Sequence, residues 1–150
     1  MANEAQFYEG TTINHITSGA SLADAGFSLD TDISVNVDNT FYKFPLGKAI
    51  LIVNDVSAAP AAGKTVDLYR RGMNVSSTLD EPQPDSNFKA TFVGSFLIDA
   101  VDPAASDTPY VLMGVPLLPN EMQFYIQNNL GVTLSSWKLS IIPYTYKPAA

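Results

Sequence analysis

Short stretches of the chain alternate between apolar and polar residues from residue 32 onward. Ile33, Val35 and Val37 alternate with polar neighbours, and the same period of two recurs in residues 88–98, 122–127 and 137–141. Because successive side chains of a strand point to opposite faces, this pattern predicts β-strands with one face on a core and the other toward solvent or a contact. No stretch of a dozen residues shows the apolar spacing of an amphipathic helix.

Turn-forming residues separate these stretches at strand-like intervals. The 150 residues include ten prolines and nine glycines, and turn signals gather near residues 45–47, 60–63, 82–85, 102–103, 119–120 and 128–131. About eight or nine strands fit between them, which is the number expected of an antiparallel β-sandwich or jelly-roll. We therefore predict one all-β domain over residues 31–150.

The first thirty residues keep neither the period of a strand nor that of a helix. They are rich in small and polar residues, and their apolar residues are scattered. We therefore expect residues 1–30 to form an extended N-terminal arm, with a short helical turn near residues 21–25. Free polar termini are usually poorly ordered, so a stable arm would have to be pinned against something.

Residues 49–53 are apolar at every position. In a strand, Ala49, Leu51 and Val53 would face one side, and Ile50 and Ile52 would face the other. An antiparallel strand that is apolar on both faces should be covered on both. Two coverings are open: the N-terminal arm folds over the outer face, or a second subunit contacts Ile50 and Ile52 there.

Composition and charge narrow the possible partners. Hydrophobic residues make up 46% of the chain and charged residues 15%, which is below the usual quarter and leaves apolar surface for a subunit interface. The net charge is −7, and the eight lysines and arginines form no run. Nucleic acid and anionic membrane surfaces are therefore not expected partners. The start of the chain lacks the pattern of a signal peptide, and residues 49–53 are too short to span a bilayer.

One stretch looks like the start of a phosphate-binding loop, because an aliphatic run leads into Gly63-Lys64-Thr65. That motif needs a glycine at position 58, where Ala58 stands, and a helix after the threonine. The residues after Thr65 alternate with a period of two instead. We therefore expect a loop between two antiparallel strands and no nucleotide cofactor.

Other candidates for chemistry are few. The absence of cysteine excludes disulfides and thiolate sites. His15, the single histidine, lies in the predicted arm, where a catalytic base would be poorly positioned. The acidic clusters in residues 80–85 and 99–107 lack the spacing of a calcium loop and are expected to be solvated. Arg70 and Arg71 either meet an acidic patch on a neighbouring subunit, or one of them is exposed and the other packs its stem across the sheet. We expect no catalytic residue, metal or cofactor.

Four segments in this order resemble small structural proteins of tailed bacteriophages: LGKAILIVNDVS, TVDLYRRGMN, NFKATFVGSFLID and EMQFYIQNNLGVTLSSWKLSIIPYTY. Within that group the chain is similar, over about residues 32–146, to capsid decoration (cement) proteins with a jelly-roll or β-sandwich body. The likeness lies in the texture and order of the segments rather than in a diagnostic motif.

The resemblance implies a structural virion protein that binds the outside of a phage head and stabilises it, as a trimer. Its partners would be the major capsid protein and further copies of itself, and it would be made in the host cytoplasm. The arm would grip the shell or a neighbouring subunit through four apolar anchors, namely Phe7, Tyr8, Ile13 and Ile16.

Two alternatives stay open at this point. One alternative to a decoration protein is a carbohydrate-binding or host-attachment module. The other is a different head or tail component of a virion. A stacking platform for sugars would use Tyr110, Trp137, Tyr144 and Tyr146. Trp137 is in phase with Leu139 and Ile141, however, which favours a place in the core.

Overall fold

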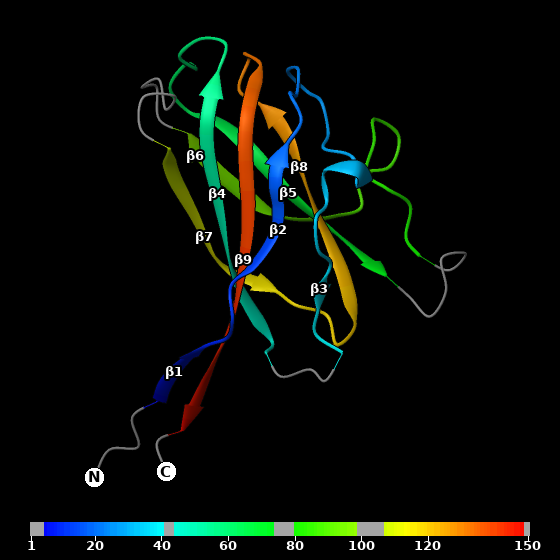
Figure 1. Cartoon of the computed structure of the whole chain (residues 1–150), viewed down its shortest axis with the longest axis vertical. Coiled ribbons are helices and arrows are strands. Elements are labelled where there is room, and N and C mark those ends of the chain that lie inside the picture. Colours follow the sequence, from blue (N-terminus) through cyan, green and yellow to red (C-terminus); the bar gives the residue numbers. More distant parts are fainter. Residues whose placement is uncertain (1–4, 41–43, 74–79, 99–106, 149–150) are drawn as a thin grey trace.

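Two antiparallel β-sheets packed face to face make up the body of the protein (Figure 1). The structure, a computed structural model, describes residues 5–40, 44–73, 80–98 and 107–148. These residues form nine strands and one short 3-10 helix: β1 (Ala5–Glu9), β2 (Ile13–Gly19), η1 (Asp30–Asp32), β3 (Val37–Asp38), β4 (Leu46–Val56), β5 (Lys64–Met73), β6 (Thr91–Ile98), β7 (Thr108–Pro116), β8 (Glu121–Asn129) and β9 (Leu134–Pro148).

The strands pair in a nested order. Sheet A has the order β2-β9-β4-β7, with β1 continuing along the same edge of β9 as β2, and sheet B has the order β3-β8-β5-β6. Leaving β1 aside, the first strand therefore pairs with the last, the second with the second last, and so on inward. This nesting is what a single long antiparallel hairpin produces when it rolls into two sheets, and it defines a jelly-roll. The predicted all-β jelly-roll is confirmed.

The core lies between the sheets and is built from the inward residues of each strand. Ala49, Leu51 and Val53 of β4 are fully buried, and so are Trp137 and Leu139 of β9. The indole N–H of Trp137 donates to the carbonyl of Ala20 at 2.9 Å, which satisfies its one polar group. The prediction that Trp137 belongs to the core is confirmed.

The loop after β4 connects the two sheets. It leads from β4 in sheet A to β5 in sheet B, and β5 begins at Lys64 immediately after Gly63, whose φ is +77°. Lys64 and Thr65 are therefore the first residues of a strand rather than of a helix, as predicted. The two strands that it joins do not pair with each other.

The N-terminal residues are more closely integrated than the sequence suggested. β2 pairs with β9, and Ile16 is 1% exposed in the core. Residues 25–28 follow the edge of β8, where the amide of Ser28 donates to the carbonyl of Ile126 at 2.9 Å. Residues 13–28 therefore lie in the body rather than in a free arm. The pairing of β2 with β9 shifts register twice, and such bulges break the period of two that would have revealed a strand.

His15 is held at the centre of this N-terminal segment. Its side chain is fully buried, its Nδ1–H donates to the carbonyl of Val35 at 2.6 Å, and its Nε2 accepts from the amide of Phe124 at 3.0 Å. The expectation of a poorly positioned histidine is wrong. Burial lowers the pKa of His15, against the opposing effect of its backbone hydrogen bonds.

Within the described residues, β1 and the end of β9 extend away from the body. β1 pairs with the last residues of β9, from Ala5 opposite Pro148 to Glu9 opposite Tyr144. These two segments form a two-stranded ribbon, residues 5–9 and 144–148, which projects from one end of the sandwich (Figure 1). An isolated two-stranded ribbon is marginally stable in water, so a partner surface would stabilise it.

The burial of His15 predicts that folding stability depends on pH. Because the pKa of His15 is lowered in the folded state, the unfolded chain takes up the proton first as the pH falls below 6.5. The free energy of unfolding should therefore decrease between about pH 7.5 and 5.5, with a slope of at most about 1.4 kcal/mol per pH unit. Urea unfolding at each pH measures it. In His15→Gln this slope should vanish, and an equal slope in the variant would contradict the assignment.

Candidate functional site

The outer face of sheet A carries a patch of apolar side chains. Ile50 and Ile52 of β4 point away from the core and are half-buried. In register beside them lie Val111 and Pro109 of β7. The second apolar face expected of residues 49–53 is therefore present. In the described part of the chain the N-terminal segment lies beside β9 and does not fold over this face, which differs from one of the two expected coverings.

The same face continues toward the ribbon. Ile142 of β9 lies opposite Lys48, and Leu46 lies opposite Tyr144. We call these outward apolar residues the sheet A patch: Leu46, Ile50, Ile52, Pro109, Val111, Met113 and Ile142.

Three aromatic rings extend this apolar face onto the ribbon. The ring of Phe7 lies 5.2 Å from that of Tyr144 and 5.6 Å from that of Tyr146. The hydroxyl of Tyr144 accepts a hydrogen bond from the amide of Gly114 in β7 at 3.0 Å, which anchors the foot of the ribbon to the body. Phe7 and Tyr146 remain 45% and 58% exposed.

Several large exposed apolar side chains of the described residues lie here, and others lie on sheet B at Phe92 and Leu97. Val111 and Met113 are 53% and 51% exposed, and they lie on the same side of the molecule as Phe7 and Tyr146. Single exposed apolar residues are normal on a protein surface, whereas a contiguous group marks an interaction site. The sheet A patch and the ribbon are therefore the candidate functional site.

The charge of this face differs from that of the whole chain. Among the described outward residues between the ribbon and Ile52, the carboxylate of Glu9 is paired with the ammonium of Lys48 at 2.5 Å. Lys138 lies beside Ile52 at the far end of the patch. The chain as a whole has a net charge of −7. The patch is thus a nearly neutral area on an acidic protein.

The outer face of sheet B is partly covered by the chain itself. Residues 25–36 pack along the β8 side of it, and the outward tyrosines Tyr69 and Tyr125 are 5% and 0% exposed. The ring of Phe27 lies 5.5 Å from that of Tyr69, and the Nε2 of Gln127 donates to the carbonyl of Ala25 at 3.2 Å. In the described residues the chain therefore covers the β8 side of sheet B and leaves Phe92 and Leu97 of β6 exposed.

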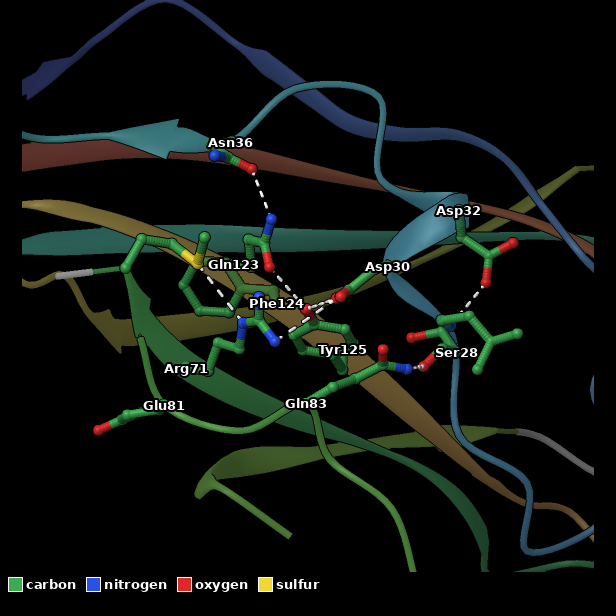
Figure 2. Close-up of polar contacts among 12 residues, drawn as sticks. Ser28, Asp30, Asp32, Asn36, Arg71, Glu81, Gln83, Gln123, Phe124 and Tyr125 are labelled. Carbon is green, nitrogen blue, oxygen red and sulfur yellow. Dashed lines mark hydrogen bonds and ion pairs between the residues drawn. The ribbon is translucent and has the colours of Figure 1, made fainter. Parts of the chain in front are cut away.

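A polar cluster fastens this cover (Figure 2). The Tyr125 hydroxyl hydrogen-bonds to the carboxylate of Asp30 and lies 2.6 Å from Oε1 of Gln123, whose Nε2 donates to Oδ1 of Asn36 at 2.8 Å. Burial, followed by the bond to Asp30, raises the pKa of Tyr125. The phenol is therefore a neutral donor near pH 7, and its position indicates a structural role.

The two arginines point to opposite faces of β5. Arg70 turns inward and its Nη1 donates to the carbonyl of Pro116 at 2.5 Å, while burial lowers its pKa. Arg71 lies over the ring of Tyr125, 5.7 Å from its centroid, with Nη1 at 3.7 Å from Asp30. Of the two predicted roles, packing across the sheet describes Arg71. Its charge is engaged within the chain rather than presented to a neighbour.

The predicted anchors separate in the structure. Phe7 lies on the outer face of the ribbon, in line with Ile50 and Ile52. Tyr8 is 43% exposed on the opposite face of the ribbon. Ile13 packs against the core, and Ile16 belongs to it. Burial makes Ile16 unavailable to another protein, which corrects its place among the anchors.

A cavity of about 330 Å³ lies where the ribbon joins the body. Its lining residues are Thr11, Ile13, Val37, Asp38, Asn39, Thr40, Phe44, Leu117 and Pro143. Thr40 donates its amide and hydroxyl to the Asp38 carboxylate, and these bonds lower the pKa of Asp38. Asp38 is the single ionisable side chain of that lining, so it shows no pair of acid and base.

The described residues contain no group of three or more histidine or acidic side chains that could hold a metal ion. No helix in the part of the chain that the structure describes is long and apolar enough to cross a membrane. No protein-family model, curated protein or solved structure matches the chain.

Sequence reasoning missed the contribution of β7 to the patch. Pro109, Val111 and Met113 have the spacing of one strand face, but Tyr110 and Leu112 between them are also hydrophobic, so the alternation is hidden. The aromatic group was missed for another reason. Phe7 and Tyr146 are far apart in the sequence and meet through the pairing of β1 with β9.

The polar cluster predicts that loss of the Tyr125 hydroxyl lowers the stability of the fold. In Tyr125→Phe, the buried amide of Gln123 and the half-exposed carboxylate of Asp30 lose the phenol, so the free energy of unfolding should fall by about 1–3 kcal/mol. Tyr146→Phe is the matched control, because the exposed phenol should change stability by less than about 0.5 kcal/mol. Urea unfolding of both variants provides the comparison. Equal effects would show that the Tyr125 hydroxyl has no special part in holding residues 28–36.

Proposed function

We propose that this protein is a capsid decoration (cement) protein, which binds the outside of a tailed-phage head and stabilises it. Its partner would be the major capsid protein, and it would act as a trimer. The observation that carries the proposal is the projecting aromatic ribbon on a jelly-roll body. Phe7 and Tyr146 remain about half exposed there, on a ribbon that has little support of its own.

The jelly-roll fold and the sequence resemblance together support this function. Jelly-rolls are common in viral capsid proteins and also occur in lectins and cupins. The fold alone therefore does not decide among these functions. The resemblance of residues 32–146 to phage decoration proteins favours the virion.

Decoration requires affinity and valency rather than chemistry. A trimer that touches several shell subunits gains strongly over a single contact. The net charge of −7 would keep many copies soluble and away from packaged nucleic acid.

A sugar-binding platform has less support. Trp137 is fully buried and Tyr144 is 4% exposed, so these two rings are not available for stacking on a glycan. Another place in the virion, in the head or the tail, would be distinguished by location and copy number. Electron microscopy of particles of the virus that encodes the chain provides both.

The ribbon predicts how a truncation behaves. Deletion of residues 2–9 should leave the body folded, because β2 and the core stay intact. Loss of Phe7 and the β1 strand should weaken binding to undecorated heads by roughly tenfold or more, since burying one phenylalanine contributes about 1.5–3 kcal/mol. Sedimentation of heads with labelled protein measures the affinity. A deletion of residues 2–20 would not test the ribbon alone, because it also removes the buried residues His15 and Ile16.

The matched control for the truncation is Leu97→Ala, on the outer face of sheet B and 62% exposed. It should bind heads as the full chain does. Equal affinity of the truncated and full chains would show that the ribbon is not the shell contact. Failure of the folded full chain to bind heads, or its location in the tail, would overturn the decoration function.

A further inference from the structure

The cavity beside the ribbon has the size and the charge to take a side chain of another protein. We propose that it binds one lysine of the shell protein, whose ammonium group pairs with the carboxylate of Asp38. The inference rests on the proposed function and deepens it, because it names the chemistry that the partner presents beside the ribbon. It adds a charged contact to the aromatic contact of Phe7 and Tyr146.

The cavity lies at the foot of the ribbon. Thr11, two residues after the end of β1, lines it, and so does Pro143, which directly precedes the part of β9 that pairs with β1. The amide of Gly10 donates to the carbonyl of Pro143 at 2.7 Å and ties the two segments together at this point. A protein that holds the ribbon therefore lies within reach of the cavity.

The chain itself holds the walls of the cavity in place. The Nδ2 of the buried Asn39 donates to the carbonyl of Phe44 at 2.8 Å and to that of Leu118 at 2.9 Å. The amide of Leu117 donates to the carbonyl of Pro45 at 3.0 Å. These bonds join the segments that follow β3 and β7 to the start of β4. A site that is already formed costs less conformational entropy on binding.

The cavity carries a negative charge that the described residues do not neutralise. Asp38 is the single ionisable side chain of its lining, and hydrogen bonds from the hydroxyl and the amide of Thr40 lower the pKa of this carboxyl. In the pairing of β3 with β8, Asp38 lies directly opposite Glu121, so both side chains are on the same face. Neither belongs to an ion pair within the described ranges. Two like charges so placed favour a bound cation.

The bonds of Asp38 favour an ammonium over a guanidinium. Both donors of Thr40 bond to Oδ1, the amide at 2.9 Å. Oδ2 accepts no hydrogen bond from the residues that the structure describes. The paired bonds that arginine makes to a carboxylate need both oxygens, whereas the ammonium of lysine acts as a point charge and needs only one.

The rest of the cavity suits the stem of a lysine. Its apolar lining consists of the buried Val37, Leu117 and Pro143 and the half-buried Ile13 and Phe44. The methylene groups of lysine can lie along these side chains while the ammonium stays at the exposed rim. At roughly 30 Å³ for each non-hydrogen atom, the volume of a water in the liquid, a lysine side chain fills about 150 Å³. The cavity of about 330 Å³ has room for one such side chain.

The test is the affinity of Asp38→Asn for undecorated heads, measured by sedimentation of labelled protein. The variant removes the charge and keeps an oxygen for Thr40, so it should fold and bind about three- to tenfold more weakly than the unchanged protein. Its affinity should also fall less when NaCl rises from about 0.05 to 0.5 M, because one screened charge pair is missing.

Asp85→Asn is the matched control, because it removes the same charge outside the cavity. Asp85 is exposed, and its Oδ1 accepts two local amides, those of Asn87 and Phe88, both at 2.7 Å. This variant should bind heads, and respond to salt, as the unchanged protein does. A loss equal to that of Asp38→Asn would show that only net charge matters and would overturn the cavity contact.

Chemical modification of the heads identifies the partner group. Acetylation of the lysines of the heads removes their charge, whereas dimethylation keeps it. The difference in affinity between the unchanged protein and Asp38→Asn should disappear on acetylated heads and remain on dimethylated heads. A difference that persists after acetylation would overturn the assignment of a lysine.

A second variant keeps the test decisive if Asp38→Asn fails to fold. Thr11→Lys, at an exposed position of the lining, would place an ammonium of the chain itself beside Asp38 and should weaken head binding at least about threefold. Circular dichroism and thermal unfolding identify folded variants. Folded variants that bind heads as the unchanged protein does would overturn the cavity contact and leave the decoration function in place. If the unchanged protein does not bind heads, the decoration function and this inference both fail.

Discussion

The pairing of β9 with three other strands is the constraint on which the rest of the structure depends. β4 occupies one edge of β9, and β2 and β1 follow each other along the other edge. Its inward side chains, including Trp137 and Leu139, fill the core, and its outward side chains supply Ile142, Tyr144 and Tyr146 to the opposite surface. Because one strand does both, the core and the candidate interaction surface share a single register, and a slip by one residue would exchange them.

The outer faces of the two sheets differ because the N-terminal segment lies against sheet B. Residues 25–36 pack on sheet B, where the bonds of Tyr125 to Asp30 and of His15 to Val35 and Phe124 hold them. Buried polar groups are costly without partners, so these bonds make the placement of the segment specific. The segment covers one side of sheet B, and apolar side chains on β6 and on sheet A remain exposed.

The ribbon and the sheet A patch differ in shape and in side chains. The ribbon is narrow and aromatic and projects from the body, which suits insertion into a partner of different shape. The sheet A patch is flat, aliphatic and nearly neutral.

Local alternation and backbone chemistry were enough to predict the all-β class, the turns at residues 60–63 and 119–120, the strand after Gly63 and the core position of Trp137. The sequence also indicated the double apolar character of Ala49–Val53. Tertiary structure decided the rest. Bulged pairing with β9 placed Ile16 and His15 in the body, and long-range strand pairing brought Phe7 to Tyr144 and Tyr146. Arg70 and Arg71 are engaged within the chain by partners far away in the sequence. Such contacts depend on register and on which face a segment covers, and neither is encoded in the local pattern.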